Sequence, residues 1–306
     1  MNSTRSDACL SDPMKRVCAA MVTYYPDLHV AERIMRWLAQ VSFFCVIDNG
    51  SDEDSLTAVR KLAAQGRVVL IENHANLGIA AALNQAMDFA YFKGFEWLLT
   101  LDQDSLPVFG YVRYQFAALH ACPYADSVAV VGGRPIEVDL ATDKTAPREN
   151  RHNRWHPEKN VITSGSLCRC DILVRMGGFR TELFIDLVYT EYRLRLRQQG
   201  LHVIVSDQAQ FYHRFGETRV HRIGPFRLVR RLYTPTRNYY RTRNGLMLAL
   251  EWGRREPRWA IRRMIRLFRL LMNVIVLHDR KAENLRMIMR GVIDGLRRRT
   301  GPIDGA

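Results

Sequence analysis

Short apolar runs alternate with helical patterns over the first hundred residues, and this alternation limits the fold more strictly than any other feature of the sequence. The apolar runs occupy residues 16–23, 43–47, 68–71 and 96–101, and between them apolar side chains recur at a spacing of three and four. Strands that are separated by helices need crossover connections, which produce parallel strands with buried faces. The sequence therefore predicts an α/β fold built on a mainly parallel sheet.

The 306 residues suffice for one large α/β domain with an appendage. We predict a disordered N-terminal extension at residues 1–15, a sheet-containing domain at residues 16–225 and a basic helical region at residues 226–306. Hydrophobic residues make up 47% of the chain, and this fraction excludes an intrinsically disordered protein.

Three features of the sequence indicate where in the cell the protein is located, and they favour the cytoplasm. The N-terminus lacks the basic and apolar regions of a signal peptide, and no uncharged apolar stretch reaches the ~18 residues that a spanning helix needs. The six cysteines form no Cys-x-x-Cys pair, so neither a zinc ribbon nor a disulfide framework is indicated. We therefore expect a cytoplasmic protein without transmembrane helices.

Positive charge is concentrated in the last third of the chain. The whole chain has a net charge of +14, and residues 219–300 hold 22 basic residues against 5 acidic ones. Residues 264–277 interleave Arg266 and Arg269 with apolar side chains at helical spacing, so we expect an amphipathic helix there. A segment of this charge is expected to meet an anionic partner.

Two anionic partners fit this charge, and a third interpretation needs no partner. Phe268, Leu271 and Val274 are expected to enter the interface of an anionic membrane, which would place the chain peripherally on the inner face of the cell membrane. Tyr233 and Tyr239, beside arginines, could instead stack on nucleic-acid bases, but no recognised nucleic-acid-binding motif is present. The third interpretation is an arginine-rich helix face that contacts only water. We favour the membrane and expect no nucleic-acid partner.

Polar residues at the ends of the apolar runs are the candidates for ligand binding, because an open parallel sheet binds ligands beyond the carboxyl ends of its strands. Asp102 and Asp104 follow the fourth run. Two such carboxylates repel unless a cation neutralises them, and a hard divalent ion with oxygen ligands does so. Asp-x-Asp alone often marks only a turn, but its position after a strand predicts a metal site for a nucleotide diphosphate. His213 is a candidate third ligand with Asp104.

Glycine patterns restrict the cofactor. The first apolar run ends at Thr23 and continues with Tyr24 instead of Gly-x-Gly-x-x-Gly, which excludes a dinucleotide cofactor. The P-loop pattern is also missing, which excludes an ordinary nucleoside triphosphatase. Residues 76–84 open a helix with small side chains, so a ligand could approach the N-terminus of that helix. Tight packing of the helix on the sheet explains the same residues equally well.

A series of short motifs occurs in order along the chain. They are Thr23, Asp48-Asn49-Gly50-Ser51, Asn76-x-Gly78-Ile79-Ala80 with Asn84, Leu101-Asp102-Gln103-Asp104-Ser105, Thr163-Ser164-Gly165, Gly177-Gly178-Phe179, Phe184-Ile185-Asp186, Thr190-Glu191, Tyr212-His213-Arg214 and Tyr239-Tyr240-x-x-Arg243-Asn244. Together they resemble the family 2 glycosyltransferases, and more narrowly the bacterial rhamnosyltransferase branch. The resemblance extends over about residues 16–300.

This resemblance implies a fold and a reaction. The fold is GT-A, a Rossmann-like and mainly parallel sheet, here followed by C-terminal amphipathic helices. The reaction is an inverting transfer of a deoxyhexose, for this branch L-rhamnose from dTDP-β-L-rhamnose, which gives an α-linked product. The implied acceptor is a growing cell-surface polysaccharide or a lipid-linked glycan, as in O-antigen assembly for lipopolysaccharide.

The resemblance also implies roles for residues of the donor site. Thr23 and Asp48 would hold the nucleoside, with Asp48 on the pyrimidine base, and Asp102 would contact the ribose or the nearby sugar. Asp104 and His213 would bind a divalent metal ion, Mg²⁺ or Mn²⁺, on the diphosphate. These five residues therefore form the expected centre of the site.

Five further residues are expected around this centre. Gly78 and Asn84 would belong to the donor site, and Ser164, Gly165 and Arg195 would line the sugar or acceptor pocket. Two of these residues have simpler explanations, because Arg195 could pair with the glutamate four residues before it, and a strand-to-turn transition explains Gly165 equally well.

The sequence departs from its family at the general base. An inverting enzyme needs a base that takes the proton of the acceptor hydroxyl, and the branch usually reads Phe-Ile-Asp-x-Val-Asp-x-Glu. Tyr189 stands at the second Asp of this pattern, and a phenol with a reference pKa of about 10 is a poor replacement for a carboxylate. Either Asp186 or Glu191 takes the catalytic role, or the enzyme is weak, altered in its acceptor or inactive.

Overall fold

A computed structural model describes residues 13–137, 155–157, 161–214, 217–223 and 226–303 of the chain. Its contacts divide the chain into two compact units. The first unit comprises Met1–Asn76, Ala82–Gly178 and Arg195–His213, and the second comprises Leu77–Ala81, Phe179–Leu194 and Arg214–Ala306. The predicted basic region at residues 226–306 lies wholly in the second unit. Most of the predicted N-terminal extension, residues 1–12, lies outside the described residues.

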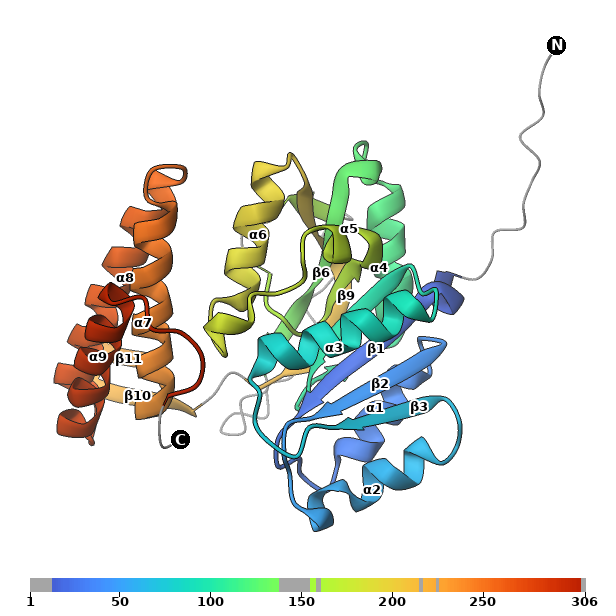
Figure 1. The fold of residues 1–306 in the computed structure, drawn as a ribbon, viewed down its shortest axis with the longest axis horizontal. Coiled ribbons are helices and arrows are strands. Elements are labelled where there is room, and N and C mark those ends of the chain that lie inside the picture. Colours follow the sequence, from blue (N-terminus) through green and yellow to red (C-terminus); the bar gives the residue numbers. More distant parts are fainter. Residues whose placement is uncertain (1–12, 138–154, 158–160, 215–216, 224–225, 304–306) are drawn as a thin grey trace. The chain divides into compact units, whose positions relative to one another are not determined.

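Four parallel strands form one half of the sheet in the first unit, in the order β3-β2-β1-β4 (Figure 1). The strands are β1 (Val17–Thr23), β2 (Phe43–Asp48), β3 (Val68–Glu72) and β4 (Trp97–Asp102). The intervening helices are α1 (Val30–Leu38), α2 (Glu53–Ala63) and α3 (Ile79–Phe92). Each strand and helix lies where the periodicity of the sequence predicts it, and the pairing is parallel as expected.

The other half of the sheet contains both parallel and antiparallel pairs. Beyond β4 the order is β8-β6-β9-β5, and β7 also pairs with β9. These strands are β5 (Leu106–Pro107), β6 (Val128–Glu137), β7 (Trp155–Pro157), β8 (Ser166–Arg169) and β9 (His202–His213). The helices of this stretch of the chain are α4 (Tyr111–His120), α5 (Cys170–Arg175) and α6 (Val188–Gln198). Residues 188–194 of α6 belong to the second unit. β9 brings residue 213, at its carboxyl end, into the same sheet as β4.

A buried core underlies the carboxyl edge of the sheet in the first unit. Trp37 from α1 packs edge-to-face on Tyr111 from α4, and Tyr111 packs in the same way on Phe211 from β9. The indole Nε1 of Trp37 donates a hydrogen bond of 2.9 Å to the carbonyl oxygen of Ser105. The core therefore anchors the turn that follows β4.

The five cysteines in the described part of the chain are free and buried. Burial raises the pKa of the Cys45 thiol to about 12 and that of Cys170 to about 12. Because the thiolate is the reactive form, these side chains are inert at neutral pH.

The second unit contains a hairpin and three long helices. The hairpin strands β10 (Glu217–Ile223) and β11 (Phe226–Leu232) are antiparallel, and the helices are α7 (Pro235–Trp252), α8 (Pro257–Leu277) and α9 (Lys281–Leu296). The sequence predicts a helical region at residues 226–306, and this is wrong for Phe226–Leu232, which form β11 because pairing with β10 overrides the helical pattern. Pro235 and Pro257 each stand in the first turn of a helix, where proline is favoured.

Helix α8 is amphipathic as predicted, but one side chain lies on the wrong face for the membrane contact that we expected. Val274 is 2% exposed and packs inside the second unit, so it cannot enter lipid. Leu271 is partly buried, and Phe268 is 63% exposed. In the described part of the chain, no helix has both the length and the apolar character needed to cross a membrane.

Candidate active site

The carboxyl ends of the first four strands meet at one edge of the sheet. The strand register places Thr23 beside Asp48, and Asp48 beside Glu72. On the other side of β1, Asp102 lies beside Val22. The polar residues that end the apolar runs are therefore neighbours, as the parallel arrangement requires.

Asp102, Asp104 and His213 come together at this edge. Asp102 ends β4, Asp104 lies in the following turn, and His213 ends β9. The Nδ1 atom of His213 lies 3.1 Å from Oδ1 of Asp104, and its Nε2 atom lies 3.8 Å from Oδ2 of Asp102. One potential ligand atom from each of the three residues lies within 4.8 Å of the others. The structure thus unites three residues that lie up to 111 positions apart in the sequence.

The donor set fits a divalent cation. Oδ1 of Asp104 is buried and accepts no hydrogen bond from the described residues, although Nδ1 of His213 lies 3.1 Å away. A buried carboxylate oxygen without a donor is costly unless a cation satisfies it. Two carboxylates and one imidazole form a ligand set that suits Mn²⁺ and related divalent ions, and carboxylate oxygens also suit Mg²⁺. The three residues can therefore hold a metal ion. The predicted division of roles, with Asp104 and His213 on the metal and Asp102 on the ribose or sugar, stays a prediction.

Two buried hydroxyl groups support this cluster. The Oγ atom of Ser105 lies 3.0 Å from Nδ1 of His213 and 2.6 Å from Oγ of Ser164. The backbone amide of Asp102 donates a hydrogen bond of 3.1 Å to the same Ser164 hydroxyl. Ser105 was quoted in the sequence motif but given no role, and its place directly after Asp-x-Asp was the available signal. Ser164, predicted for the sugar or acceptor pocket, is buried behind the acidic residues.

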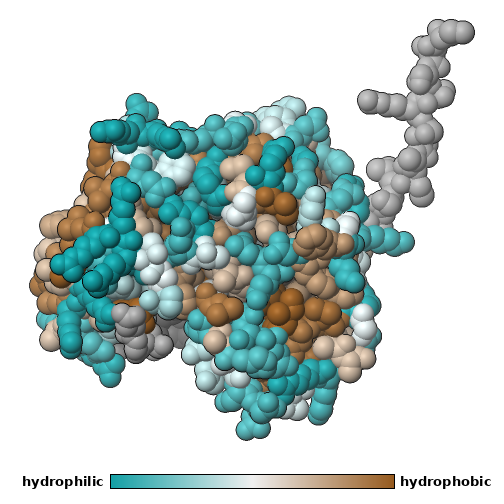
Figure 2. All heavy atoms as spheres, viewed as in Figure 1, coloured by the Kyte–Doolittle hydropathy of each residue, from teal (hydrophilic) through white to brown (hydrophobic). Residues whose placement is uncertain are grey.

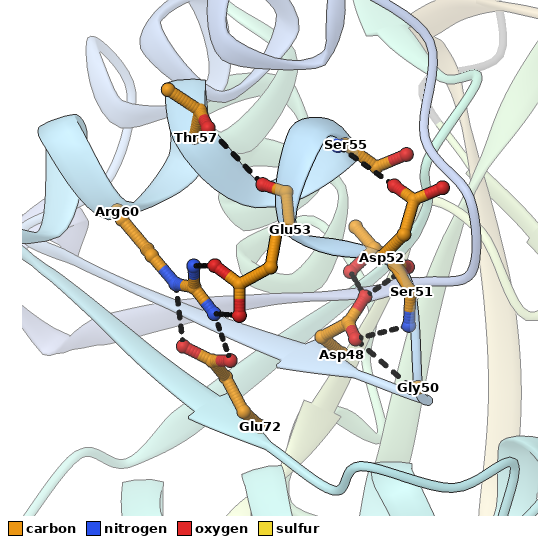
Figure 3. Close-up of polar contacts among 10 residues, drawn as sticks. Asp48, Gly50, Ser51, Asp52, Glu53, Ser55, Thr57, Arg60 and Glu72 are labelled. Atoms are coloured by element: carbon orange, nitrogen blue, oxygen red, sulfur yellow. Dashed lines mark hydrogen bonds and ion pairs between the residues drawn. The ribbon is translucent and has the colours of Figure 1, made fainter.

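Asp48 organises the turn after β2 (Figure 3). Its carboxylate accepts hydrogen bonds from the backbone amides of Gly50 and Ser51, at 2.9 and 2.8 Å, and from the Ser51 hydroxyl. The Thr23 hydroxyl donates a fourth hydrogen bond of 2.9 Å. Thr23 and Asp48, the predicted nucleoside-site residues, therefore lie at the expected edge. The carboxylate of Asp48 already accepts four hydrogen bonds that stabilise the turn. A direct contact with a base would have to replace one of these four bonds.

A charged group adjoins the Asp48 turn at the end of β3. Arg60 from α2 forms two hydrogen bonds with Glu72, of 2.9 and 2.7 Å, and also contacts Glu53 at the start of the same helix (Figure 3). These hydrogen bonds hold the pKa of the Glu72 carboxyl below its usual range. The arginine thereby ties α2 to the strand edge that carries the nucleoside-site residues.

Gly78 and Asn84, which are predicted donor-site residues near the start of α3, both make packing contacts in the structure. In the second unit, Gly78 has φ of +83°, and a Cβ atom there would lie 2.6 Å from the ring of Phe184. The backbone amide of Ile79 donates a hydrogen bond of 2.8 Å to the Phe184 carbonyl. In the first unit, Asn84 packs against Gly178. The packing interpretation of this small-residue segment therefore has direct contacts, and the donor-site role stays a prediction.

Gly165 and Arg195 both bond to the backbone within the first unit. The Gly165 carbonyl accepts hydrogen bonds from the Tyr111 hydroxyl and the Gln115 amide, at 2.6 and 2.9 Å. The guanidinium of Arg195 donates to the carbonyl oxygens of Met176 and Gly178. These contacts fix the segments before β8 and after α5, and their role in a sugar or acceptor pocket stays a prediction.

Tyr189, which stands at the expected base position, and the two candidate bases Asp186 and Glu191 lie in the second unit in different surroundings. Tyr189 is buried, and its ring stacks on Phe179 with the centroids 4.9 Å apart. Glu191 is 1% exposed and lies 3.9 Å from Nη1 of Arg180. Asp186 keeps 13% of its side chain exposed. Tyr189 therefore serves packing, and Asp186 is the more accessible of the two carboxylates.

The segment around Asp186 is held in an unusual backbone conformation. Phe184, Asp186 and Leu187 all have φ between +62° and +65°, which non-glycine residues rarely adopt. Asn244 from α7 donates hydrogen bonds of 2.9, 2.8 and 3.1 Å to the carbonyls of Leu183, Ile185 and Asp186. In the sequence, Asn244 belongs to a motif that predicts no specific role for it. Its place on a helix more than fifty residues away gave no indication of this contact.

Comparisons with known proteins give a family and a fold. Residues 38–180 match the family model described as glycosyl transferase family 2. The chain is 28% identical over 301 residues to the dTDP-rhamnosyl transferase RfbF of Shigella flexneri, and the match covers 93% of this chain and 97% of that protein.

Two solved structures of similar fold contain a nucleotide sugar. One is the mannosyltransferase PcManGT from Pyrobaculum calidifontis in complex with GDP-Man and Mn²⁺, at 16% identity and a TM-score of 0.53, covering 93% of this chain and 88% of that chain. The other is S. aureus TarS 1–349 in complex with UDP-GlcNAc, at 15% identity and a TM-score of 0.62, covering 94% and 82%. These matches confirm the GT-A fold that the sequence predicts.

Proposed function

We infer that this chain is a family 2 glycosyltransferase, and more narrowly a rhamnosyltransferase that takes its sugar from a nucleoside diphosphate donor. The observation that carries this inference is the meeting of Asp102, Asp104 and His213 at the carboxyl edge of the sheet, where open α/β sheets bind ligands. The relative at 28% identity is named for dTDP-rhamnosyl transfer. That name supports dTDP-β-L-rhamnose as the donor.

We propose that the donor binds along the carboxyl edge of the sheet, and that both its nucleoside and its diphosphate contact this edge. The turn that Asp48 and Thr23 shape would receive the nucleoside, and Asp102 would contact the ribose or the sugar. Asp104 and His213 would hold a divalent ion, either Mg²⁺ or Mn²⁺. When bound there, the ion supplies positive charge that stabilises the diphosphate leaving group.

We propose Asp186 as the general base of an inverting displacement. Its carboxylate is the more exposed of the two candidates, and Nε of Arg237 donates a hydrogen bond of 3.3 Å to its Oδ2. The contacts of Asn244 with the neighbouring carbonyls hold the backbone of this segment. In the proposed reaction the acceptor hydroxyl loses its proton to Asp186, its oxygen bonds to the anomeric carbon, and the bond to the diphosphate breaks on the opposite face. Glu191 is almost fully buried, so we propose that it pairs with Arg180 and is not the base.

The acceptor we propose is a cell-surface polysaccharide or a lipid-linked glycan, and helix α8 would bring the enzyme to the membrane that carries it. Apolar side chains exposed on α8 share one face at helical spacing. They are Ile261, Met264, Ile265, Phe268, Met272, Ile275 and Val276. Arg262, Arg266 and Arg269 lie along one border of this face. This arrangement is typical of a helix that lies in the interface of an anionic membrane.

The surface of the second unit agrees with this proposal. Apolar and polar atoms lie next to one another over the region of α8 and α9 (Figure 2). Exposed apolar side chains that gather on one helix face mark an interaction site more often than scattered ones do. With Val274 buried, Phe268 and its exposed neighbours carry the proposed contact with lipid.

A panel of donors tests the reaction and the metal site together. We expect release of nucleoside diphosphate from dTDP-rhamnose in the presence of Mg²⁺ or Mn²⁺, and little release from UDP-GlcNAc or GDP-mannose. Asp104→Ala should lower this release by at least the ~10–100-fold that loss of an outer-shell contact costs at metal sites. Asp88→Ala, which changes an exposed acid on α3, is the matched control. Equal turnover of wild type and Asp104→Ala would contradict the proposed site.

A further inference from the structure

A cavity of about 160 Å³ lies in the second unit between α7 and α8. Its walls include Arg241 from α7, Arg266 and Arg269 from α8, and Tyr233, which precedes α7. None of the residues described around this cavity is acidic. The cavity is formed entirely by residues of the second unit, and none of the acidic residues assigned to the donor site contributes to it.

The arginines that line this cavity pair with no carboxylate among the described residues. Within the described residues, no ion pair forms at Arg241, Arg266 or Arg269, whereas the nearby Arg237 pairs with Asp186. Arg263 lies close by, buried between α8 and α7. Burial, together with the charges of Arg241 and Arg266, lowers its pKa to about 10.

Two buried polar atoms beside the cavity have no hydrogen-bond partner. Among the residues that the structure describes, Nε of Arg241 donates no hydrogen bond, and Oδ1 of Asn238 accepts none. Asn238 is 1% exposed, so bulk water does not reach its side chain freely. An apolar occupant would leave both atoms unsatisfied, at a substantial cost. A polar ligand therefore suits this cavity better than an apolar one, and an acceptor group could bond to Nε of Arg241.

The cationic wall is held in position before any ligand arrives. The guanidinium of Arg241 lies over the ring of Tyr233, 4.0 Å from its centroid. Nε2 of His278 lies 3.2 Å from the Tyr233 carbonyl, and Nδ2 of Asn284 lies 3.2 Å from Nδ1 of the same histidine. These contacts hold the imidazole between Tyr233 and Asn284. A site fixed in this way loses little conformational entropy when it binds.

We propose that this cavity binds a phosphate or diphosphate ester through Arg241, Arg266 and Arg269. Planar guanidinium groups recognise phosphate oxygens by paired, charge-assisted hydrogen bonds. Arg266 and Arg269 also border the exposed apolar face of α8, on which Ile265 and Phe268 lie. A phosphate held here could therefore belong to a lipid whose chains lie along that face. The phosphate site follows from the cavity alone, and only its assignment to a lipid rests on the proposed membrane contact of α8.

Binding measurements on the full chain test this site in two arms. The first arm titrates inorganic pyrophosphate in the presence of a chelator, so that no divalent ion bridges the ligand to Asp102 and Asp104. The second arm measures binding to vesicles that contain either phosphatidic acid, a phosphate monoester, or phosphatidylserine, a diester. The variants are Arg266→Gln and Arg269→Gln, and the matched control is Arg262→Gln on the same helix. All three arginines are exposed, so the variants are expected to fold.

We expect each cavity variant to weaken pyrophosphate binding about 10-fold or more relative to Arg262→Gln, because hydrogen bonds to charged groups are stronger than neutral ones. A matching loss on phosphatidic acid vesicles that exceeds the loss on phosphatidylserine vesicles assigns the site to a lipid phosphate. A loss with pyrophosphate alone supports the site and assigns it to a soluble phosphate. Equal behaviour of the cavity variants and the control in both arms would overturn the proposal. Hydrolysis of the sugar donor should be unchanged in all three variants, so failure here is distinct from failure of the proposed reaction.

Discussion

Single hydroxyl groups decide how the acidic residues and His213 are presented. Ser105 contacts Nδ1 of His213, and its own carbonyl is held by Trp37 in the core. Ser164 contacts both the Ser105 hydroxyl and the amide of Asp102. These buried groups determine the orientation of the ligands, as outer-shell contacts do at metal sites.

Removal of the Ser105 hydroxyl should therefore weaken the metal site without removing a ligand. We expect Ser105→Ala to lower the affinity for Mn²⁺ by about 10–100-fold, the range known for outer-shell contacts. Titration with Mn²⁺, followed by electron paramagnetic resonance, measures this affinity directly. Ser127→Ala is the control, because its hydroxyl bonds only to the Tyr124 carbonyl in the same unit. An unchanged affinity in Ser105→Ala would show that the hydroxyl does not orient the ligands.

The contact between Arg60 and Glu72 should make the free energy of unfolding depend on pH. Because its pKa is lowered in the folded state, Glu72 stabilises the fold above its unfolded pKa of about 4.3, and this contribution is lost as the pH falls through the lower folded value. We expect Glu72→Gln to be less stable than wild type at pH 7 by up to about 1 kcal/mol. The difference should disappear in acid. Urea unfolding at pH 7 and below pH 4 measures it, with Glu32→Gln on α1 as control, and a difference that persists in acid would contradict the assignment.

The sequence predicts the elements of the first unit more accurately than those of the second. The strands β1 to β4 and the helices between them follow their periodicity closely, because each has a buried face with a single repeat. β11 follows its partner strand instead of its own pattern. The polar and apolar faces of α8 follow from the helical repeat, but which apolar residues are covered depends on packing against α7 and α9, and this buries Val274.

The exposed face of α8 leads to a prediction about membranes. Replacing Phe268 by Ser should reduce binding to vesicles of anionic phospholipid several-fold, because burial of an apolar side chain contributes about 1.5–3 kcal/mol when it is complete. Co-sedimentation with vesicles measures the bound fraction. Phe92→Ser, an exposed phenylalanine on α3, is the matched control. If the two variants bind vesicles alike and as strongly as wild type, α8 does not enter the lipid.

At the scale of the whole molecule, the chain passes more than once between its two units. The expected metal ligands and nucleoside residues belong to the first unit, and Asp186, Glu191 and the basic helices belong to the second. A ligand of the first unit should therefore stabilise that unit in preference to the other. Calorimetry can separate the two because each unit has its own buried core.

Ligand binding should be visible as a shift in thermal unfolding. With Mn²⁺ and a nucleoside diphosphate at about 100 times the dissociation constant, we expect about 2.7 kcal/mol of stabilisation of the unit that binds them. For a unit of this size the melting temperature should rise by about 2–4 °C per kcal/mol. Asp104→Ala should lose most of this shift, and Asp88→Ala should keep it. A shift of equal size in Asp104→Ala would place the ligand elsewhere.

The sequence by itself determined the parallel half of the sheet, the polar residues at its carboxyl edge and the basic character of the C-terminal helices, because each of these depends on a repeat or a composition that lies within one segment. Only the tertiary structure decided that Ser105 contacts His213, that Asn244 holds the segment before Asp186, and that three arginines face one cavity. These contacts join residues far apart in the chain through side-chain packing, and no local pattern of residues encodes a distance between segments.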